Sequence, residues 1–262
     1  HQGVSLNSAL LPGPDNLLPL TQSLFHFRER KYAFAADVEK QFHQIQIIKD
    51  DIQCQRYFWR DCDSSKPPKI YIHTAMLFGP TDSPSKANAV RIIHADNSCN
   101  EFPSAATAAK NSMYMDDFFD SHDTVAEAAQ SAHDAIKMFE RISWKLVDFR
   151  SNANEVINTL PSSHVNSNLL IDFDKDESSE IYKVLGSYWN PLKDIIQFKQ
   201  ISEMQLKEKS LVVDYHPTKR ELLSFVMKIY DILGLIAHFI IRGRMIIQRV
   251  WKEQLGWDDP IS

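Results

Sequence analysis

The sequence has 262 residues, of which 44% are hydrophobic and 24% charged, with a net charge of −5. This is the composition of a globular chain with a well-buried core; its net charge does not indicate nucleic-acid binding by the chain as a whole, and no apolar run approaches the ~18 residues that cross a membrane. Three scattered cysteines, Cys54, Cys62 and Cys99, indicate a reducing compartment rather than a disulfide framework.

The first part of the chain predicts strands and helices in alternation. A loop over residues 1–20 leads into a short helix within 17–30, and then "YAFAADVEKQFHQIQI" predicts a strand that runs into a turn or short helix. Two further strands are expected at "CQRYFW" and "IYIHTAML", with the turn "DCDSSKPPK" between them. The stretch "SPSKANAVRIIHADN" predicts a helix with Pro84 in its first turn and Ser83 or Ser85 as its cap. Four residues follow helical spacing along it: Ala87, Val90, Ile93 and His94.

The second part predicts a strand–turn–strand at "SMYMDDFF", an amphipathic helix at "TVAEAAQSAHDAIKMFERI" and a polar segment over 159–180. A hairpin is expected at "YKVLGSYWNPLKDIIQF". A helix then begins at the capping box Thr218-x-x-Glu221 and ends at Gly234, and a second one spans 235–254. The first of these has the apolar stripe Leu222, Phe225, Ile229 and Leu233.

Basic residues gather in these last two helices. They could form a local phosphate-binding face or simply the solvated side of the helices. The residues are Lys219, Arg220, Lys228, Arg242, Arg244, Arg249 and Lys252.

Adjacent carboxylates at Asp116 and Asp117 interrupt an otherwise apolar stretch. Solvation at a β-turn is the ordinary explanation for such a pair, but the flanking apolar residues hold it at the rim of a core. A third carboxylate, Asp37, directly follows the apolar strand in "FAADVEKQF". Two strands that each end in Asp can bring these groups to one point. Hard oxygen ligands suit Mg²⁺, and two ions ~3.5–4 Å apart are the arrangement used for phosphoryl transfer.

The sequence resembles the reverse transcriptases through five blocks in the family's order. The blocks are Asp37 with Phe42, "LFGPTDSPSKAN", Tyr-Met-Asp-Asp (114–117), "SWKLVDFRSN" and "VLGSYWNP". A finer resemblance is to the polyproteins of BEL/Pao-type LTR retrotransposons, carried by "SLNSALLPGPDN", "LGSYWNPLKDIIQF", "TKRELLSFVMKIYDILGLIAHF" and "VWKEQLGWDDP".

The resemblance implies an α+β fold: a right-hand polymerase palm, in which an antiparallel sheet packs on helices, with partial fingers and a helical thumb. Residues 1–180 would form the partial fingers and palm, 181–200 the primer-grip hairpin, and 201–262 the thumb and start of the connection. Because the chain begins at His1, after the point where the family's fingers place basic residues, we expect a fragment.

The resemblance also assigns roles within the site. Asp37 and Asp116 would be the principal ligands of two Mg²⁺ ions, for which Mn²⁺ could substitute, with Asp117 more peripheral and the carbonyl of Val38 completing the shell. Phe42 would exclude a ribose 2′-hydroxyl. Phe78 and Gly79 would line the dNTP pocket. The residues expected to contact template and primer are Ser83, Pro84, Tyr114, Met115, Leu185, Gly186 and Tyr188.

The implied activity is RNA-directed DNA polymerisation, the addition of dNMP to a primer 3′-hydroxyl on an RNA or DNA template. The implied setting is a cytoplasmic virus-like particle, beside the protease, RNase H and integrase of a polyprotein. A catalytically inactive remnant that at most binds nucleic acid is the alternative, and a host-recruited protein-interaction domain has no positive feature. The departures that favour a remnant are the missing fingers, Pro80 after Gly79, and Ser143, Val147 and Asp148 in place of Gly, Arg and Lys.

Other chemistry-bearing residues have ordinary explanations. Structural zinc is disfavoured because Cys54, Cys62, His73, His94 and Cys99 lack paired ligand spacing. Loop solvation is expected for Asp61, Asp63, Asp120 and Asp123. Core or hairpin packing is expected for Trp144, Trp189, Trp251 and Trp257.

Overall fold

The computed structural model describes residue 3 and residues 5–165, 182–198 and 216–261. The chain divides into two compact units, His1–Phe173 and Asp174–Ser262, and each is described by itself. Both combine helices with small antiparallel sheets, so the expected α+β class is confirmed. No helix of the described residues is long and apolar enough to span a membrane.

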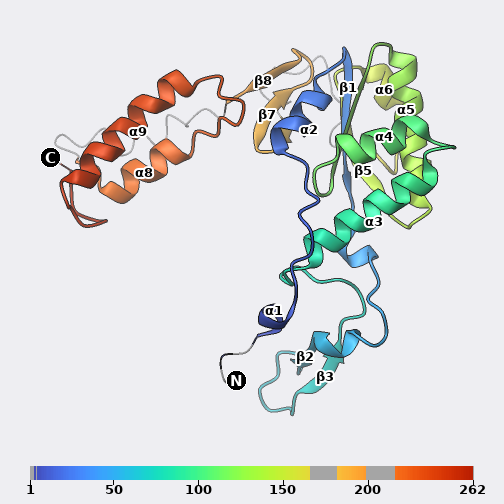
Figure 1. Cartoon of the computed structure of the whole chain (residues 1–262), viewed down its shortest axis with the longest axis horizontal. Helices are drawn as coiled ribbons and strands as arrows, with labels where there is room; N and C mark the ends of the chain where they lie inside the picture. Colours follow the sequence, from blue (N-terminus) through green and yellow to red (C-terminus); the bar gives the residue numbers. More distant parts are fainter. Residues whose placement is uncertain (1–2, 4, 166–181, 199–215, 262) are drawn as a thin grey trace. The chain divides into compact units, whose positions relative to one another are not determined.

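A three-stranded antiparallel sheet forms the centre of the first unit (Figure 1). Its order is β4 (Asp117–His122), β1 (Tyr32–Val38) and β5 (Leu146–Ser151). The middle strand β1 reads almost continuously apolar because helices cover both of its faces. The expected strand before Asp116 is reduced to a single bridge between Tyr114 and Asp117, and the strand after it extends farther than expected, to His122.

Helices α4 (Pro103–Asn111), α5 (Val125–Glu140) and α6 (Asn154–Thr159) pack on one face of this sheet, and α2 (Leu20–Phe27) on the other (Figure 1). Consecutive phenylalanines of β4 serve the two faces, because side chains alternate along a strand. The ring of Phe118 meets Phe139 of α5 with centroids 5.6 Å apart, and the ring of Phe119 meets Phe27 of α2 at 5.3 Å. Both phenylalanines are almost completely buried, so the strand that begins at Asp117 is held from both sides.

Helix α3 (Ser83–Ser98) has the expected extent and Pro84 in its first turn, but its cap differs from the expectation. No side chain caps it, and the hydroxyl of Ser83 instead donates to the carbonyl of Leu77 at 2.8 Å. Of the four residues with helical spacing, Ala87, Val90 and His94 pack inward, whereas Ile93 is 60% exposed. The buried face is partly polar and consists of Ser83, Ala87, Asn88, Arg91, Ala95 and Ser98. Helix α4, strand β5 and helix α6 were not predicted.

The segment between β1 and α3 contains the 3₁₀ turns η1 (Gln41–Gln44) and η2 (Ile52–Gln55) and the hairpin β2 (Arg56–Trp59) and β3 (Lys69–Ile72). Both expected strands of the hairpin are confirmed. The N-terminal stretch contains the short helix α1 (Leu6–Ala9), whose Asn7 side chain donates to the carbonyl of Gly79 and accepts from the amide of Thr81. This stretch therefore fixes the loop before α3.

The second unit contains a three-stranded meander where a hairpin was expected: β6 (Tyr182–Val184), β7 (Ser187–Asn190) and β8 (Ile195–Gln197). Helix α8 (Lys219–Met227) begins at the expected capping box but ends seven residues before Gly234. The carboxylate of Asp231 accepts from the amides of Leu235 and Ile236 and so turns the chain into α9 (Ala237–Lys252). Most of the predicted polar segment 159–180 lies outside the described residues.

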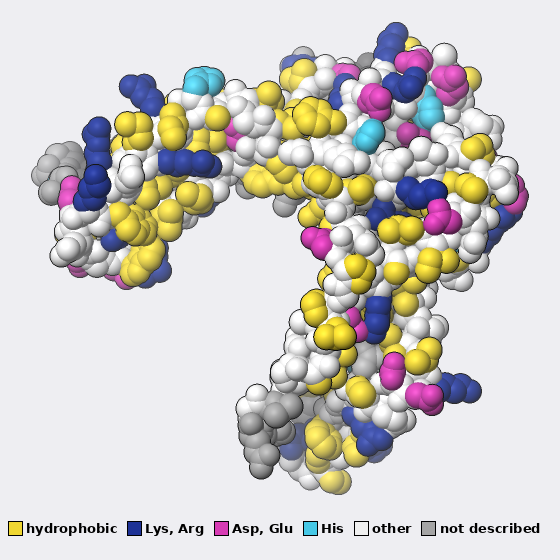
Figure 2. Space-filling model, viewed as in Figure 1, with side chains coloured by type: hydrophobic (Ala, Val, Ile, Leu, Met, Phe, Trp, Pro, Cys, Tyr) yellow, Lys and Arg dark blue, Asp and Glu magenta, His cyan; other side chains and the backbone are white. Residues whose placement is uncertain are grey.

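Helices α8 and α9 expose many hydrophobic side chains beside Lys and Arg (Figure 2). Two of the seven basic residues are engaged internally: Lys219 is buried with its Nζ over the Trp251 ring, and Arg220 pairs with Asp258. Trp144 and Trp189 are buried as expected, whereas Trp251 and Trp257 are 41% and 47% exposed and meet edge to face.

The Thr124→Ala substitution is expected to lower the free energy of unfolding of the first unit by about 1 kcal/mol. Thr124 caps α5 through a reciprocal capping box, in which its hydroxyl accepts from the amide of Glu127 at 3.2 Å. Urea unfolding measures the change, with the exposed Thr81→Ala as the matched control. Equal effects of the two substitutions would contradict the assignment of the cap.

Candidate active site

The register of the central strand pair places two carboxylates opposite each other. Asp37, next to last in β1, pairs across the sheet with Asp117, the first residue of β4. Asp116 is joined to the same strand end, because its carbonyl accepts from the amide of Val38 at 2.9 Å. The structure therefore brings together the three carboxylate-bearing residues that the sequence nominated, Asp37, Asp116 and Asp117.

The environment of both paired carboxyl groups disfavours their ionised forms and raises their pKa values. The pKa of Asp37 is raised to about 6, mainly by burial and then by the nearby charges of Asp116, Asp148 and Glu39, while the charge of Arg150 lowers it. Burial likewise raises the pKa of Asp117 to about 7, with added repulsion from Asp116 and Asp37. Each group is thus harder to ionise than an ordinary carboxyl group, and a bound cation would favour its ionised form.

Strand β5 brings one acid and one base to this end of the sheet. Its register shifts between Ala35 and Asp37 of β1, and Asp148 at the shift has a positive φ of 55°. This bulge lets both Asp148 and Arg150 act electrostatically on Asp37. Asp148, the departure that argued for a remnant, therefore does add negative charge at the site.

The donor set fits a divalent cation in its chemistry. Its groups are carboxylates, the ligands that Mg²⁺ and Mn²⁺ prefer, and the raised pKa values of Asp37 and Asp117 show that positive charge would stabilise their ionised forms. In the described part of the chain, no three His, Cys, Asp or Glu side chains are already arranged to hold a metal ion. Metal binding would therefore require rotation of these side chains.

The turn that carries Asp116 is fixed at each of its residues. Tyr114 and Asp117 exchange backbone hydrogen bonds of 2.9 and 3.0 Å, and Met115 between them has a positive φ of 54°. The buried side chain of Gln41, in η1, donates to the carbonyl of Met115 at 3.1 Å. The turn is thus connected to the segment that directly follows Asp37.

A buried arginine supports the approach to this turn. Arg91 of α3 is 1% exposed, and its guanidinium donates to the carbonyls of Ala109 and Met113 and to Oδ1 of Asn88. Burial lowers its pKa to about 10, so it remains charged. The only sequence signal was an arginine among apolar residues of the predicted helix, and its backbone partners, the carbonyls of Ala109 in α4 and of Met113 after it, leave no mark in the sequence.

The predicted nucleotide-pocket residues Phe42 and Phe78 lie in direct contact. Their rings stack with centroids 4.8 Å apart, and His43 meets Phe78 edge to face at 5.3 Å. Phe42 is 7% exposed and Phe78 is 68% exposed, so Phe78 covers Phe42. Half-buried Met115 packs against a small cluster of Phe42, Met76 and Ala87, which places the carboxylate turn beside the Phe42 ring.

The remaining predicted site residues have mainly structural contacts. Gly79 has a φ of 106°, which disfavours a side chain there, and Ser83 holds the loop that precedes Phe78. Leu185 and Gly186 form the β6–β7 turn with positive φ, and a Cβ on Gly186 would lie 2.7 Å from the Tyr230 ring. This turn and the half-exposed Tyr188 belong to the second unit.

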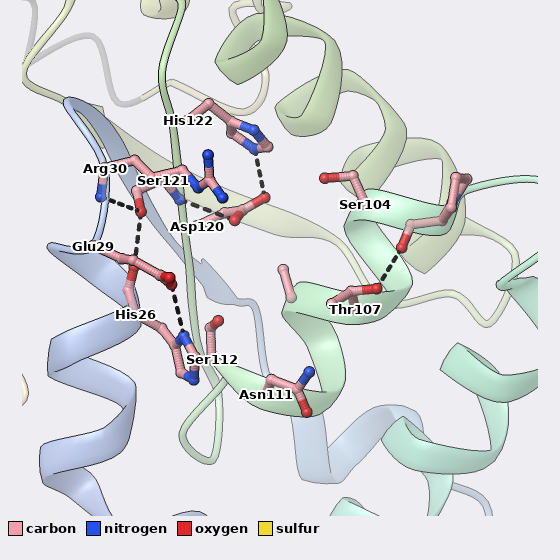
Figure 3. A pocket seen from close by; sticks show the side chains of 12 residues that line it. His26, Glu29, Arg30, Ser104, Thr107, Asn111, Ser112, Asp120, Ser121 and His122 are labelled. Carbon is pink, nitrogen blue, oxygen red and sulfur yellow. Dashed lines mark hydrogen bonds and ion pairs between the residues drawn. The ribbon is translucent and has the colours of Figure 1, made fainter.

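A separate polar pocket of about 480 Å³ lies along the outer edge of β4, between α2 and α4 (Figure 3). It adjoins the end of β4 at His122 rather than the end at Asp117. Asp120 accepts there from Ser131 at 2.6 Å and from the amide of Ser121 at 2.9 Å, and its Oδ2 lies 2.8 Å from Nε2 of His122. The expectation that Asp120 is a solvated loop residue is therefore wrong, because it lies in a strand and joins a hydrogen-bond network.

Residues 218–262 match a family model described as a Pao retrotransposon-like RNaseH-like domain. A comparison with curated proteins finds no match.

Solved structures of a foamy viral enzyme share the fold. The protease–reverse transcriptase dRH in complex with double-stranded DNA matches 96% of this chain at 14% identity with a TM-score of 0.56, over 36% of that chain. A complex of the protease–reverse transcriptase with double-stranded DNA matches 97% at 15% identity with a TM-score of 0.56, over 43% of that chain. Its complex with an RNA/DNA hybrid matches 90% at 16% identity with a TM-score of 0.51, over 26% of that chain. This chain thus spans less than half the length of these enzymes.

The Asp117→Asn substitution is expected to be more favourable at pH 8 than at pH 4 when divalent cations are absent. Its effect on the free energy of unfolding, relative to the wild type, should differ between the two pH values by on the order of 2 kcal/mol. The folded-state pKa of Asp117 is about 7 against an ordinary 3.8, so this group's contribution to stability is present below about pH 4 and is lost as pH rises through about 7. The Asn side chain does not titrate and avoids that loss. Urea unfolding in chelator at both pH values measures the difference.

The matched control is Asp50→Asn, at an exposed position. It should leave the pH profile of stability as it is in the wild type. A wild-type pH profile in Asp117→Asn would contradict the raised pKa.

Arg91→Met is expected to lower the free energy of unfolding by about 1–3 kcal/mol, because the carbonyls of Ala109 and Met113 lose their donor. Arg141, which pairs with Glu101 at the surface, is the control position, and Arg141→Met should cost about 1 kcal/mol or less. Urea unfolding of both variants and the wild type measures the two losses of stability. A smaller effect at Arg91 than at Arg141 would show that the buried arginine does not support the turn.

Proposed function

We propose that this chain is the catalytic core of an RNA-directed DNA polymerase, the reverse transcriptase domain of a BEL/Pao-type retrotransposon polyprotein. The observation that carries the proposal is the pairing of Asp37 with Asp117 across β1 and β4, with Asp116 beside them. Its support is the fold shared with foamy viral protease–reverse transcriptase chains and the Pao retrotransposon-like match over residues 218–262.

Asp37, Asp116 and Asp117 would hold two Mg²⁺ or Mn²⁺ ions together with the carbonyl of Val38. When bound, such ions supply Lewis acidity at the primer 3′-hydroxyl and at the departing pyrophosphate. The chain itself orients the carboxylates: the strand register sets Asp37 against Asp117, and Gln41 and Arg91 keep the turn at Asp116 in place.

The substrates of this reaction would be a dNTP and a primer on an RNA or DNA template. The sugar of the dNTP would pack on Phe42 and replace Phe78 in the stack, while Gly79 leaves the pocket free of a side chain. The turn at Leu185 and Gly186, with Tyr188, would hold the primer end. The foamy viral complexes with double-stranded DNA and RNA/DNA hybrid motivate these partners. The reaction would take place in a cytoplasmic virus-like particle, and the same polyprotein would contain a protease, an RNase H and an integrase.

A catalytically inactive remnant that binds nucleic acid is the second candidate. Asp148 favours it, because its charge adds to the repulsion at Asp37. The stacked Phe42 and Phe78 rings also favour it, since they occupy the face on which a sugar would pack.

Primer extension on a poly(rA)/oligo(dT) hybrid with Mg²⁺ and dTTP tests the proposal. The double variant Asp116→Asn/Asp117→Asn is expected to lose extension by about 10²–10⁴-fold, because metal-assisted catalysis contributes several kcal/mol. The matched control is Asp50→Asn/Asp51→Asn, an adjacent exposed pair, which should extend like the wild type. No extension by the folded wild-type chain, with or without an added upstream fingers segment, would contradict the polymerase and favour the remnant.

A further inference from the structure

The hairpin β2–β3 exposes both of its faces. All eight residues of the two strands are exposed, although six of them are aromatic or aliphatic. Phe58 is 72% exposed and Ile70 is 61% exposed. Hydrophobic side chains lie there beside Lys and Arg on the visible surface (Figure 2). Such a density of exposed rings marks an interaction surface rather than a core.

The two faces of the hairpin differ in chemistry. Side chains alternate along each strand, and cross-strand partners share a face. Tyr57 pairs with Tyr71 and Trp59 pairs with Lys69, and His73 follows on the same side; this set is called the aromatic face. The opposite face contains Arg56, Phe58, Ile70 and Ile72. One face therefore presents aromatic rings that carry polar groups, and the other is apolar apart from Arg56.

The rings of the aromatic face are already ordered. Tyr57 stacks on Tyr71 at 5.8 Å and 28°, and on His73 at 4.7 Å and 25°. The indole Nε1 of Trp59 donates to Oδ1 of Asp61 at 2.9 Å, which fixes the orientation of that ring without burying it. An incoming flat group would thus meet aligned π-faces with little loss of side-chain freedom.

The charge of the hairpin is opposite to that of the whole chain. Residues 56–73 contain the basic residues Arg56, Arg60, Lys66 and Lys69 against the acidic Asp61 and Asp63, in a chain of net charge −5. Lys66 pairs with Asp63 at 3.2 Å. Lys69 and Arg60 form no ion pair with any residue that the structure describes, and Lys69 lies directly across from Trp59. Lys69 therefore provides positive charge beside the rings of the aromatic face.

We propose that the aromatic face of β2–β3 is a binding platform for single-stranded nucleic acid. Unpaired bases would stack on Tyr71 and Trp59, whereas Tyr57 holds the Tyr71 ring in place, and the phosphates between the bases would lie against Lys69. A duplex offers no free base faces and binds such a platform poorly. A protein partner would be expected to use the opposite face instead. The platform requires no catalysis and is independent of the polymerase proposal.

Fluorescence anisotropy with labelled oligo(dT) and oligo(U) of about 15 nucleotides tests this platform. Trp59→Ala and Tyr71→Ala are each expected to weaken binding about tenfold, because each removes one stacking ring. Tyr71→Phe keeps the ring and should bind like the wild type. Lys69→Ala should reduce the slope of log K against log salt by about 0.7.

The matched controls are Phe58→Ala and Ile70→Ala, which truncate side chains on the opposite face of the same strands. They should bind within twofold of the wild type. Thermal unfolding of every variant verifies that the first unit remains folded.

Three results would overturn the platform. The first is unchanged binding by the Trp59 and Tyr71 variants, and the second is equal weakening by the opposite-face controls. The third is a dimer of the wild-type chain, seen by light scattering, that the aromatic-face variants dissociate while they still bind the oligonucleotides; the occupant would then be a second copy of the chain.

Discussion

The pairing of Asp37 with Asp117 across the two antiparallel strands is the interaction on which the site depends. Like charges in directly opposed positions destabilise a sheet. Burial, with added repulsion from neighbouring carboxylates, raises the pKa of Asp37 to about 6 and that of Asp117 to about 7. The strands remain paired because Phe118 and Phe119 anchor β4 on both faces. The packing of the sheet thus maintains an electrostatically unfavourable site, which is a common feature of functional sites.

The Phe42–Phe78 stack and the exposed hairpin are two parts of one segment. The chain leaves the stack at Phe42, forms β2–β3, and returns to it at Phe78, where the two ring centroids lie 4.8 Å apart. The base of this excursion is closed by a bridge between Gln46 and Ala75 and by a 2.8 Å hydrogen bond from Met76 to Ile45. A short hydrogen-bonded stretch of backbone therefore joins the hairpin to the Phe42–Phe78 stack.

Sequence patterns were sufficient for the long periodic elements and for the order of the motifs. Strand β1, helix α5 and the proximity of Asp37 to Asp116 follow from period, capping and spacing. Strand β5 and helices α4 and α6 were missed because they are short or alanine-rich and have weak periodicity. The buried Arg91 was missed for another reason: its partners are backbone carbonyls, which only the tertiary fold places. Stacking of Phe42 on Phe78 likewise depends on a loop conformation that no sequence pattern specifies.

Mn²⁺ binding to the isolated chain, followed by electron paramagnetic resonance, tests the central claim most directly, because it needs neither primer nor dNTP. The account predicts that Mn²⁺ binds the wild-type chain, that Mg²⁺ displaces it, and that Asp37→Asn and Asp117→Asn each weaken binding strongly while Asp50→Asn does not. Equal Mn²⁺ binding by all four proteins, or none by the wild type, would contradict the assignment of this carboxylate pair as a metal site.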